Sequence, residues 1–350
     1  MTDNEKYMNR CINLAFNGIG NVAPNPMVGC IIVHEKKIIG EGYHQNFGDW
    51  HAEVNAIKSV KNKKLLPKST LYVNLEPCSH HGKTPPCADL IIRNNIPEVI
   101  IGSIDPNKKV SGKGIEKLKK AGIKIKTGIL ENKCINLNKR FYTFHQKNRP
   151  YVILKWAQSK DGYIDIERDS DSPNQPTWIT NEITRNLVHK WRNEEQAIMI
   201  GRKTAELDNP KLTNRSWGIN SPIRIVIDNE LVLNKSLNIF NNQTPTLIFN
   251  KKLSKKNKNL EYIQLQNTYN TISQILDFLY KKNILSIIIE GGEKLLSSFI
   301  ALNLWDEARI FIGNNYFNKG IMAPKLIIKP SSVYKLIDSE LYYFKNNTRI

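Results

Sequence analysis

The stretch LEPCSHHGKTPPCADL, residues 75–90, sets two cysteines, two adjacent histidines and three prolines between two ordered segments. The apolar run TLYVNLE at 70–76 predicts a strand, and CADLIIRN at 87–94 predicts a helix. Upstream, His51 and Glu53 in DWHAEVNAI stand at the start of another predicted helix. An imidazole, two thiols and a carboxylate are therefore expected at two neighbouring helix starts.

These residue types indicate a catalytic zinc site. Zinc binds imidazole nitrogen and thiolate sulfur, and three protein ligands leave one tetrahedral position for water. A carboxylate beside that position can carry a proton to a departing amine. Nucleobase deaminases combine His-x-Glu with Pro-Cys-x-x-Cys, but here Cys87 follows Cys78 by nine positions instead of three. The alternatives are a structural zinc site with His80 or His81 as fourth ligand, and a plain loop with buried cysteines.

Basic and polar side chains accompany the motif. The inserted loop carries His80, His81 and Lys83, whose donors favour recognition of a substrate phosphate. Asn25, between two prolines, and His44, at a predicted strand end, are further candidate substrate contacts. The alternatives are a solvated loop, a rigid turn and a structural histidine. Core packing accounts for the other cysteines, Cys11, Cys30 and Cys134.

The bulk composition limits the setting. Five cysteines are too few and too uneven for a disulfide framework, so we expect a reduced, cytoplasmic environment. No apolar run approaches the ~20 residues of a membrane span, and the N-terminus has no apolar segment behind its charges, so we expect no membrane partner and no secretory signal.

The formal net charge of +19 raises the possibility of nucleic-acid binding. The lysines are spread along the chain, however, without interleaved aromatics or a periodic stripe. We therefore expect a small phosphorylated substrate and no nucleic acid. A basic protein attracts such an anion.

The chain length predicts two domains, and the pattern predicts the α/β class in both. Residues 1–145 and 150–350 are the expected domains, and 250–262 is expected to be a solvated loop. In the first domain we expect strands at 28–34, 37–44, 70–76, 98–104 and 123–130, and helices at 5–16, 51–60, 87–94 and 114–122. In the second we expect strands at 151–159, 197–201, 223–228, 246–249, 286–290 and 308–313, and helices at 182–192, 272–282 and 293–301.

Two segments of the second half have the features of ligand sites. ILSIIIEGGEKLLSSFI, residues 284–300, is strand, Gly-Gly, helix, which lets the backbone approach a phosphate; a plain tight turn is the alternative. AIMIGRKTAELDNPKLTNR, residues 197–215, places Arg202, Lys203, Asp208 and Arg215 after a strand. Open α/β sheets bind ligands at the carboxyl ends of their strands.

With PNPMVGC, GEGYH, HAEVNA and EPCSHHGKTPPC, the chain resembles the bifunctional deaminase–reductases of riboflavin biosynthesis, over nearly its whole length. The resemblance implies a cytidine-deaminase-like three-layer domain followed by a dihydrofolate-reductase-like α/β domain. It implies that His51, Cys78 and Cys87 bind Zn²⁺ and that Glu53 is the proton donor. The substrate would be a diaminopyrimidinone carrying ribosylamine 5′-phosphate, which is hydrolysed at its ring amine.

For the second half, the resemblance implies hydride transfer from NADPH to the ribosyl carbon of the deaminated product. The implied cofactor contacts are Gln158, Trp178, Thr204, Asp208, Asn229, Gly292, Glu293, Lys294, Leu295, Leu296, Ser297 and Ser298. The implied substrate contacts are Pro176, Arg192, Leu212, Arg215 and Glu290, with the arginines at the 5′-phosphate.

The approach to Trp178, RDSDSPNQPTWIT, departs from the family pattern, as do Pro176 and the segment KWAQSKDG. Two rival functions are a tRNA or nucleotide deaminase with an accessory domain, and a nucleic-acid adaptor with structural zinc. A homo-oligomer is compatible with such sheets.

Overall fold

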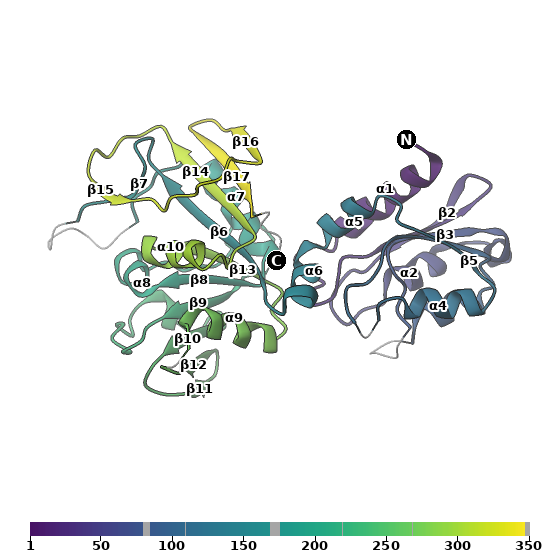
Figure 1. The fold of residues 1–350 in the computed structure, drawn as a ribbon, viewed down its shortest axis with the longest axis horizontal. Coiled ribbons are helices and arrows are strands. Elements are labelled where there is room, and N and C mark those ends of the chain that lie inside the picture. The colour runs from purple at the N-terminus through teal and green to yellow at the C-terminus, as the bar shows by residue number, and fades with distance from the viewer. Residues whose placement is uncertain (80–84, 109, 169–175, 219, 268, 347–350) are drawn as a thin grey trace. The chain divides into compact units, whose positions relative to one another are not determined.

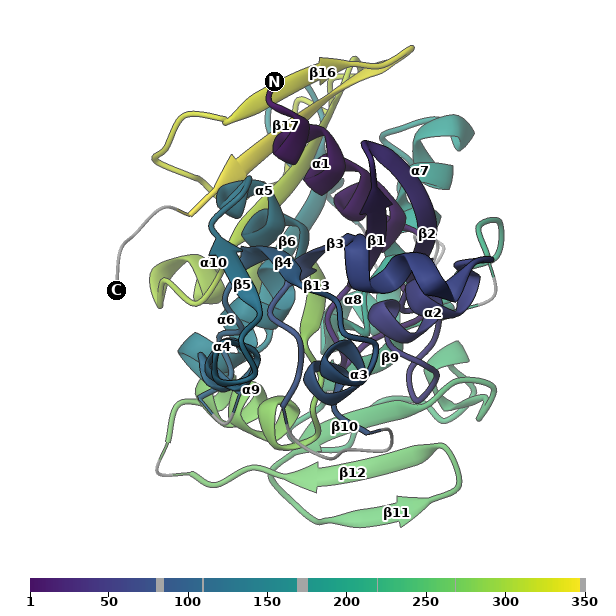
Figure 2. The same ribbon diagram turned by 90° about the vertical axis from the view of Figure 1, so that its right-hand side faces the viewer.

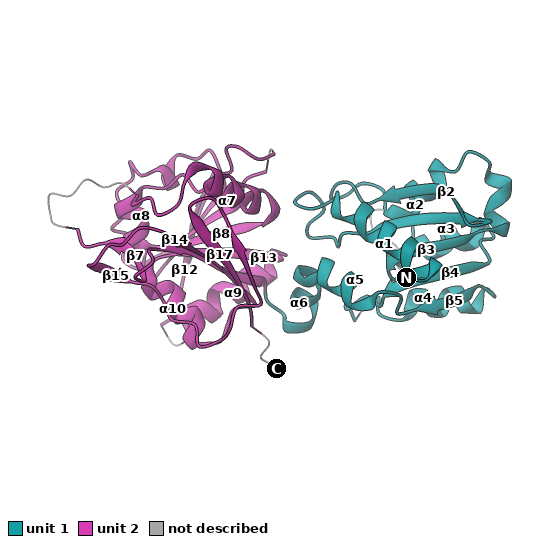
Figure 3. Ribbon diagram, turned by 90° about the horizontal axis from the view of Figure 1, so that it is seen from above, with its two compact units in different colours: residues 1–149 teal, residues 150–350 magenta. Residues whose placement is uncertain are grey.

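The computed structural model describes residues 1–79, 85–108, 110–168, 176–218, 220–267 and 269–346. The chain divides into two compact units, residues 1–149 and 150–350 (Figure 3). The sequence-based end of the first domain, at residue 145, falls within the last helix of the first unit. No helix among the described residues is long and apolar enough to cross a membrane.

The first unit is built on a five-stranded sheet in the order β2-β1-β3-β4-β5. The strands are β1 (Gly29–His34), β2 (Lys37–Tyr43), β3 (Thr70–Leu75), β4 (Glu98–Ser103) and β5 (Lys124–Thr127). β1 runs antiparallel to both neighbours, and β3, β4 and β5 are parallel. The hairpin between β1 and β2 turns at Glu35 and Lys36, whose φ angles of 46° and 62° suit a tight two-residue turn.

Helices cover both faces of this sheet. They are α1 (Asp3–Phe16), α2 (Ala52–Ser59), α3 (Cys87–Arg93), α4 (Lys113–Lys120), α5 (Glu131–Leu137) and α6 (Lys139–Lys147), with the 3₁₀ turn η1 (Lys63–Lys68). Alternate residues of a strand point to opposite faces. Cys30 and Ile32 therefore pack with α2, α3 and α4, whereas Ile31 and Val33 pack with α1 and α5 (Figure 1). The expected three-layer architecture is confirmed.

The second unit has a ten-stranded sheet in the order β11-β12-β10-β9-β8-β13-β6-β14-β17-β16 (Figure 1). The strands are β6 (Tyr151–Gln158), β8 (Ala197–Gly201), β9 (Ile223–Ile227), β10 (Thr246–Asn250), β11 (Lys255–Asn257), β12 (Leu260–Gln264), β13 (Ser286–Gly291), β14 (Glu307–Gly313), β16 (Ser332–Lys335) and β17 (Ser339–Lys345). The strands from β12 to β14 are parallel, and β11, β17 and β16 are antiparallel additions. β7 (Tyr163–Ile166) and β15 (Gly320–Met322) form a separate pair.

The helices of this unit again lie on two faces. They are α7 (Glu182–Glu194), α8 (Arg202–Asp208), α9 (Thr271–Lys281) and α10 (Glu293–Ala301), with the 3₁₀ turn η2 (Asn238–Phe240). α9 and α10 pack on one face through Leu279 and Phe299, and α7 and α8 pack on the other through Trp191 and Ala205. The α/β class expected for the second half is confirmed.

The expectation of a solvated loop at residues 250–262 is wrong. β11 and part of β12 occupy it, at the edge of the sheet (Figure 2). Leu260 is buried, and β12 pairs in parallel with β10. The exposed lysines of β11 hid the strand from sequence analysis, but charged side chains are common on edge strands, where they discourage pairing with other molecules.

Two leucines give a matched test of the second core. Leu279 is fully buried and Leu302 is 41% exposed. We expect Leu279→Ala to lower the free energy of unfolding of the second unit by about 2–5 kcal/mol, because it removes buried methyl groups and leaves a cavity. Leu302→Ala is expected to change it by less than about 1 kcal/mol. Urea unfolding of the full chain measures both, and equal effects would contradict the packing described.

Candidate active sites

The residues of the predicted zinc site lie together in the first unit. The ligand atoms of His51, Cys78 and Cys87 are all within 4.8 Å of one another. His51 Nδ1 lies 3.6 Å from Cys78 Sγ and 3.4 Å from Cys87 Sγ, so Nδ1 is the nitrogen that faces the thiols. One imidazole and two thiols are a donor set that suits zinc, and three ligands leave a tetrahedral position open.

Glu53 is placed beside this cluster by the first turn of α2. His51 is the N-cap residue of that helix, and Glu53 follows it by two residues. Glu53 is 3% exposed. Burial, reinforced by the charge of Cys78, raises the pKa of the Glu53 carboxyl above its ordinary value. A raised pKa brings the carboxyl closer to the pH at which it can both accept a proton and donate it.

The two thiols differ in acidity: the hydrogen bond to Cys78 and burial raise the pKa of the Cys87 thiol above its ordinary value, whereas the pKa of Cys78 is lowered. A hydrogen bond from the Cys87 thiol lowers the pKa of Cys78 to about 4. The Cys87 backbone N–H also donates to Cys78 Sγ at 3.4 Å. Thiolate sulfur is the form that binds metal, so the site favours ligand chemistry over inert packing.

A buried carboxylate fixes the loop that carries Cys78. Glu76 is 4% exposed and accepts hydrogen bonds from the backbone N–H groups of Asp105, Gly112, Gly114 and Ile115 at 3.0–3.3 Å. The loop after β3 is thereby tied to the N-terminus of α4. The cysteine that follows two residues later has little freedom to move away from the cluster.

Asn25 and His44 form a hydrogen-bonded pair next to the cluster. The rings of His44 and His51 lie 5.5 Å apart, and Asn25 Nδ2 lies 3.0 Å from His44 Nε2. His44 Nδ1 is 3.1 Å from the Trp50 carbonyl oxygen, so Nδ1 carries the proton and Nε2 accepts from the Asn25 amide. Burial lowers the pKa of His44, which is consistent with this neutral form. The Asn25 amide is thereby oriented with its nitrogen toward His44.

The other two predicted substrate contacts of this half, His80 and Lys83, lie outside the described residues, as does His81. Cys11, Cys30 and Cys134 are fully buried in the core, as expected.

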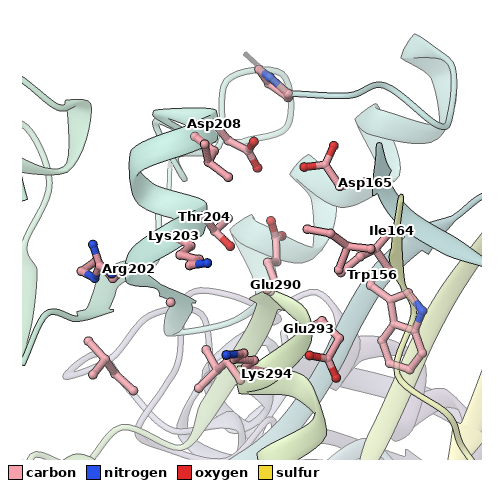
Figure 4. A pocket seen from close by; sticks show the side chains of 18 of the residues that line it. Trp156, Ile164, Asp165, Arg202, Lys203, Thr204, Asp208, Glu290, Glu293 and Lys294 are labelled. Carbon is pink, nitrogen blue, oxygen red and sulfur yellow. The ribbon is translucent and has the colours of Figure 1, made fainter. Parts of the chain in front are cut away.

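The second unit holds a cavity of about 1140 Å³ at the carboxyl ends of β6, β8, β9 and β13 (Figure 4). The structure brings many of the predicted contacts to it. Those that line it are Pro176, Thr204, Asp208, Asn229, Glu290, Gly292, Glu293, Lys294, Leu295 and Ser298.

Three charged side chains interact beside the cavity. Lys155 and Glu290 line it, whereas Arg192, a predicted substrate contact, does not. Arg192, from α7, donates to Glu290 at 2.6 Å and 3.3 Å. Burial raises the pKa of Glu290, but the charges of Arg192 and Lys155 more than offset it, so the pKa is below its ordinary value. Burial lowers the pKa of Lys155, and Arg192 adds to that effect while Glu290 opposes it.

Sequence analysis missed Lys155, although a signal was present. Lys155 interrupts the apolar strand YVILKWAQ, and a charged residue in a central strand needs a partner or a ligand. Trp156 and Asp165 also line the cavity and were not predicted.

Asp208 belongs to an ion cluster at the rim. Arg168 donates to Asp165 at 3.1 Å and to Asp208 at 3.4 Å, and Thr177 donates to Asp165 at 2.6 Å. Burial and the charge of Asp165 raise the pKa of Asp208 to about 6, against the opposing effect of Arg168. This part of the chain is where the sequence departs from the family pattern, but its residues 169–175 lie outside the described residues.

Several predicted contacts do not line the cavity. Leu212 and Leu296 are buried in the two cores, and Trp178 is 61% exposed with Arg185 over its ring. Gln158 accepts a hydrogen bond from Trp156, and Ser297 donates to Glu293, so each contacts a lining residue instead. Arg215 is exposed, and its backbone N–H donates to His189 on α7.

Comparison with known proteins identifies both halves. Residues 1–103 match the cytidine and deoxycytidylate deaminase zinc-binding region, and residues 150–315 match the RibD C-terminal domain. The riboflavin biosynthesis protein RibD of Aquifex aeolicus is 37% identical over 331 residues, which are 93% of this chain and 91% of the relative. The chain belongs to the RibD family. The RibD of Bacillus amyloliquefaciens is also 37% identical, over 92% of this chain and 87% of its own length.

Solved RibD structures agree with this assignment. A Thermotoga maritima protein described as a diaminohydroxyphosphoribosylaminopyrimidine deaminase and 5-amino-6-(5-phosphoribosylamino)uracil reductase superposes with a TM-score of 0.87 at 36% identity. Acinetobacter baumannii RibD gives 0.87 at 29% identity, and each comparison covers 98% of both chains. The tRNA deaminase and the nucleic-acid adaptor are not favoured, since neither accounts for the reductase half.

The residues present fit both groups that the RibD family implies. The His51, Cys78 and Cys87 donor set fits zinc. For NADPH, Gly292 leaves a gap beside Thr204, because a Cβ at that glycine would lie 3.2 Å from Thr204 Oγ1. Asn229 Oδ1 is buried without a hydrogen-bond partner in the described part of the chain, which suits a ligand hydroxyl.

Two buried cysteines test the zinc assignment. Cys87 and Cys134 are each fully buried, but only Cys87 lies in the cluster. We expect Cys87→Ser to lose stoichiometric zinc, because a neutral hydroxyl replaces a thiolate ligand, while Cys134→Ser keeps it. Atomic absorption of the purified variants measures the content, and a Cys87→Ser protein that retained its zinc would contradict the site.

Proposed function

We propose that this chain catalyses two successive reactions. The first unit deaminates a diaminopyrimidinone that carries ribosylamine 5′-phosphate, and the second reduces the ribosyl group of the product to ribityl with NADPH. The observation that carries the proposal is the buried Glu53 carboxyl beside three zinc-type ligands, in one chain with a reductase cavity. The two activities by which the similar Thermotoga maritima protein is described support it.

In the deamination, this chain's residues position the substrate and move protons. Zinc held by His51, Cys78 and Cys87 would supply an activated water. Glu53 takes a proton from the attacking water and delivers it to the departing amine, so ammonia leaves. Asn25, whose amide His44 orients, contacts the substrate, with His80 and Lys83 as further contacts.

In the reduction, NADPH would supply the hydride. The hydride adds to the ribosyl C1′, the bond from C1′ to the ring oxygen breaks, and that oxygen takes a proton. Lys155 and Glu290 are titratable groups on the adjacent strands β6 and β13 that line the cavity, and we assign them the handling of that proton. Arg192 keeps Glu290 in place, whereas the exposed Arg215 is better placed to bind the 5′-phosphate.

We further propose that the protein acts in the cytoplasm, binds no nucleic acid and assembles with identical copies. The free cysteines support a cytoplasmic setting. The scattered positions of the lysines support the absence of nucleic-acid binding. The apolar side chains Val333, Tyr334 and Ile337, exposed on the edge hairpin of β16 and β17, support the third.

Glu53→Gln tests the deamination. The amide keeps the shape of the side chain but cannot shuttle a proton, so we expect ammonia release to fall by at least about 100-fold. Zinc content and NADPH oxidation with the deaminated product should be unchanged. Ammonia release at the rate of the unchanged enzyme would exclude Glu53 as the proton carrier.

Arg215→Gln tests the phosphate contact. We expect the KM for the deaminated product to rise about 10-fold or more, because a charge-assisted hydrogen bond to phosphate is lost. The KM for the same compound without its phosphate should not change. Steady-state NADPH oxidation measures both, and an equal rise for the two compounds would argue against this role.

A further inference from the structure

His189 is a buried side chain on α7 that has no role in the reactions described so far. It is 8% exposed and precedes Arg192 by three residues, so both side chains lie on the same face of the helix. Both contact the segment 212–215, which carries Arg215. His189 therefore lies against the part of the chain that holds the proposed phosphate contact.

The ring nitrogen Nδ1 of His189 holds the backbone of this segment. The backbone N–H of Arg215 donates to Nδ1 at 3.3 Å. Nδ1 is therefore the unprotonated nitrogen, and the proton of the neutral imidazole is on Nε2. An imidazolium carries hydrogen on both nitrogens and cannot accept this bond, so the contact requires the neutral ring.

The surroundings of His189 keep it neutral. Burial, together with the charges of Arg192 and Arg215, lowers the pKa of His189 to about 4. Glu290 and the backbone of Thr213 act in the opposite direction and do not outweigh these effects. The imidazole is therefore uncharged near neutral pH and available as an acceptor.

The guanidinium of Arg215 is available to an anion. Arg192 is paired with Glu290 at 2.6 Å, whereas none of the described residues forms an ion pair with Arg215. Arg192 Nη1 and Arg215 Nη1 lie 3.4 Å and 3.5 Å from one acceptor, the carbonyl oxygen of Thr213. Two cations that meet at one carbonyl favour the binding of a phosphate beside them.

Other contacts shape this segment without fixing Arg215. Leu212 is 2% exposed and packs in the core. The side-chain oxygen of Asn214 closes a turn by accepting from two later backbone N–H groups, at 3.3 Å and 2.9 Å. The bond to His189 is made at Arg215 itself, so it fixes the backbone from which the guanidinium extends.

We propose that His189 is a positioning residue of the reductase, which holds the backbone at Arg215 so that the guanidinium meets the 5′-phosphate of the substrate. This inference rests on the proposed phosphate contact of Arg215. In this role His189 acts through Arg215 and does not contact the substrate. An uncharged acceptor suits the task, because a carboxylate at the same place would pair with Arg215 and compete with the phosphate.

Three variants of the full-length protein separate the properties of this side chain. His189→Asn keeps a neutral acceptor, because an amide oxygen stands as many bonds from the backbone as Nδ1 does. His189→Asp keeps an acceptor but adds a negative charge, and His189→Leu has no acceptor. Steady-state NADPH oxidation gives kcat and KM for the deaminated product and for the same compound without its phosphate.

The variants are expected to differ only toward the phosphate. We expect His189→Leu to raise the KM for the phosphorylated compound about 10-fold, and His189→Asp to raise it at least as much. His189→Asn should stay within about threefold of the unchanged protein, because the acceptor is restored. The kcat, and the KM for the compound without phosphate, should stay within about twofold in all three.

A double variant and a matched control separate positioning from general stability. Arg215→Gln/His189→Leu should be no worse than Arg215→Gln alone, because the guanidinium that His189 positions is already absent. Val188→Ala is the control, since Val188 is also 8% exposed and precedes His189 on α7 but packs in the core. We expect it to lower the free energy of unfolding in urea without changing either KM.

An unchanged KM in His189→Leu, or an equal rise for both compounds, would overturn the positioning role. So would a His189→Asn protein as impaired as His189→Leu, additive effects in the double variant, or the same rise in Val188→Ala. These outcomes differ from failure of the proposed phosphate contact, in which Arg215→Gln by itself would leave the KM for the phosphorylated compound unchanged.

Discussion

The site of the first unit depends on one constraint, which is that the ligand atoms of His51, Cys78 and Cys87 lie within 4.8 Å of one another. His51 and Cys87 come from the starts of the helices α2 and α3, and Cys78 comes from the loop between β3 and α3. Each of these segments is tied to the sheet or to another helix. The buried Glu76 carboxylate, with its four backbone donors, holds the loop. This support holds the two thiols and the buried Glu53 carboxyl together, although their negative charges repel each other when they ionise.

In the second unit, the direction of the strands brings the residues of the cavity together. Because β6, β8, β9 and β13 are parallel, their carboxyl ends meet at one edge, and residues more than a hundred positions apart share a cavity. Burial then makes the central charges interdependent. Glu290 stays ionised because Arg192 and Lys155 lie beside it, and neither cation would be stable there without the carboxylate.

The sequence was sufficient to predict that His51, Cys78 and Cys87 lie together. The zinc cluster and the Gly-Gly turn stand out because each combines unusual residue types with a predicted strand or helix boundary. Lys155 was missed because its role depends on Glu290, which lies far away in the sequence and adjacent only in the sheet. β11 and β12 were missed because exposed lysines obscure the strand pattern, and no element was assigned to α5 and α6, whose polar residues outnumber the buried Cys134, Phe141 and Phe144.

The net charge of +19 is a poor guide to where this protein binds anions. Many of its lysines are exposed in pairs such as Lys120 with Glu116 and Lys281 with Asp277, which salt screens and which contribute little. Lys155 and Arg192 act differently, because they lie beside the buried Glu290, where a low dielectric strengthens the interaction between charges. Position within the sheet therefore separates the functional basic residues from the many that the composition supplies.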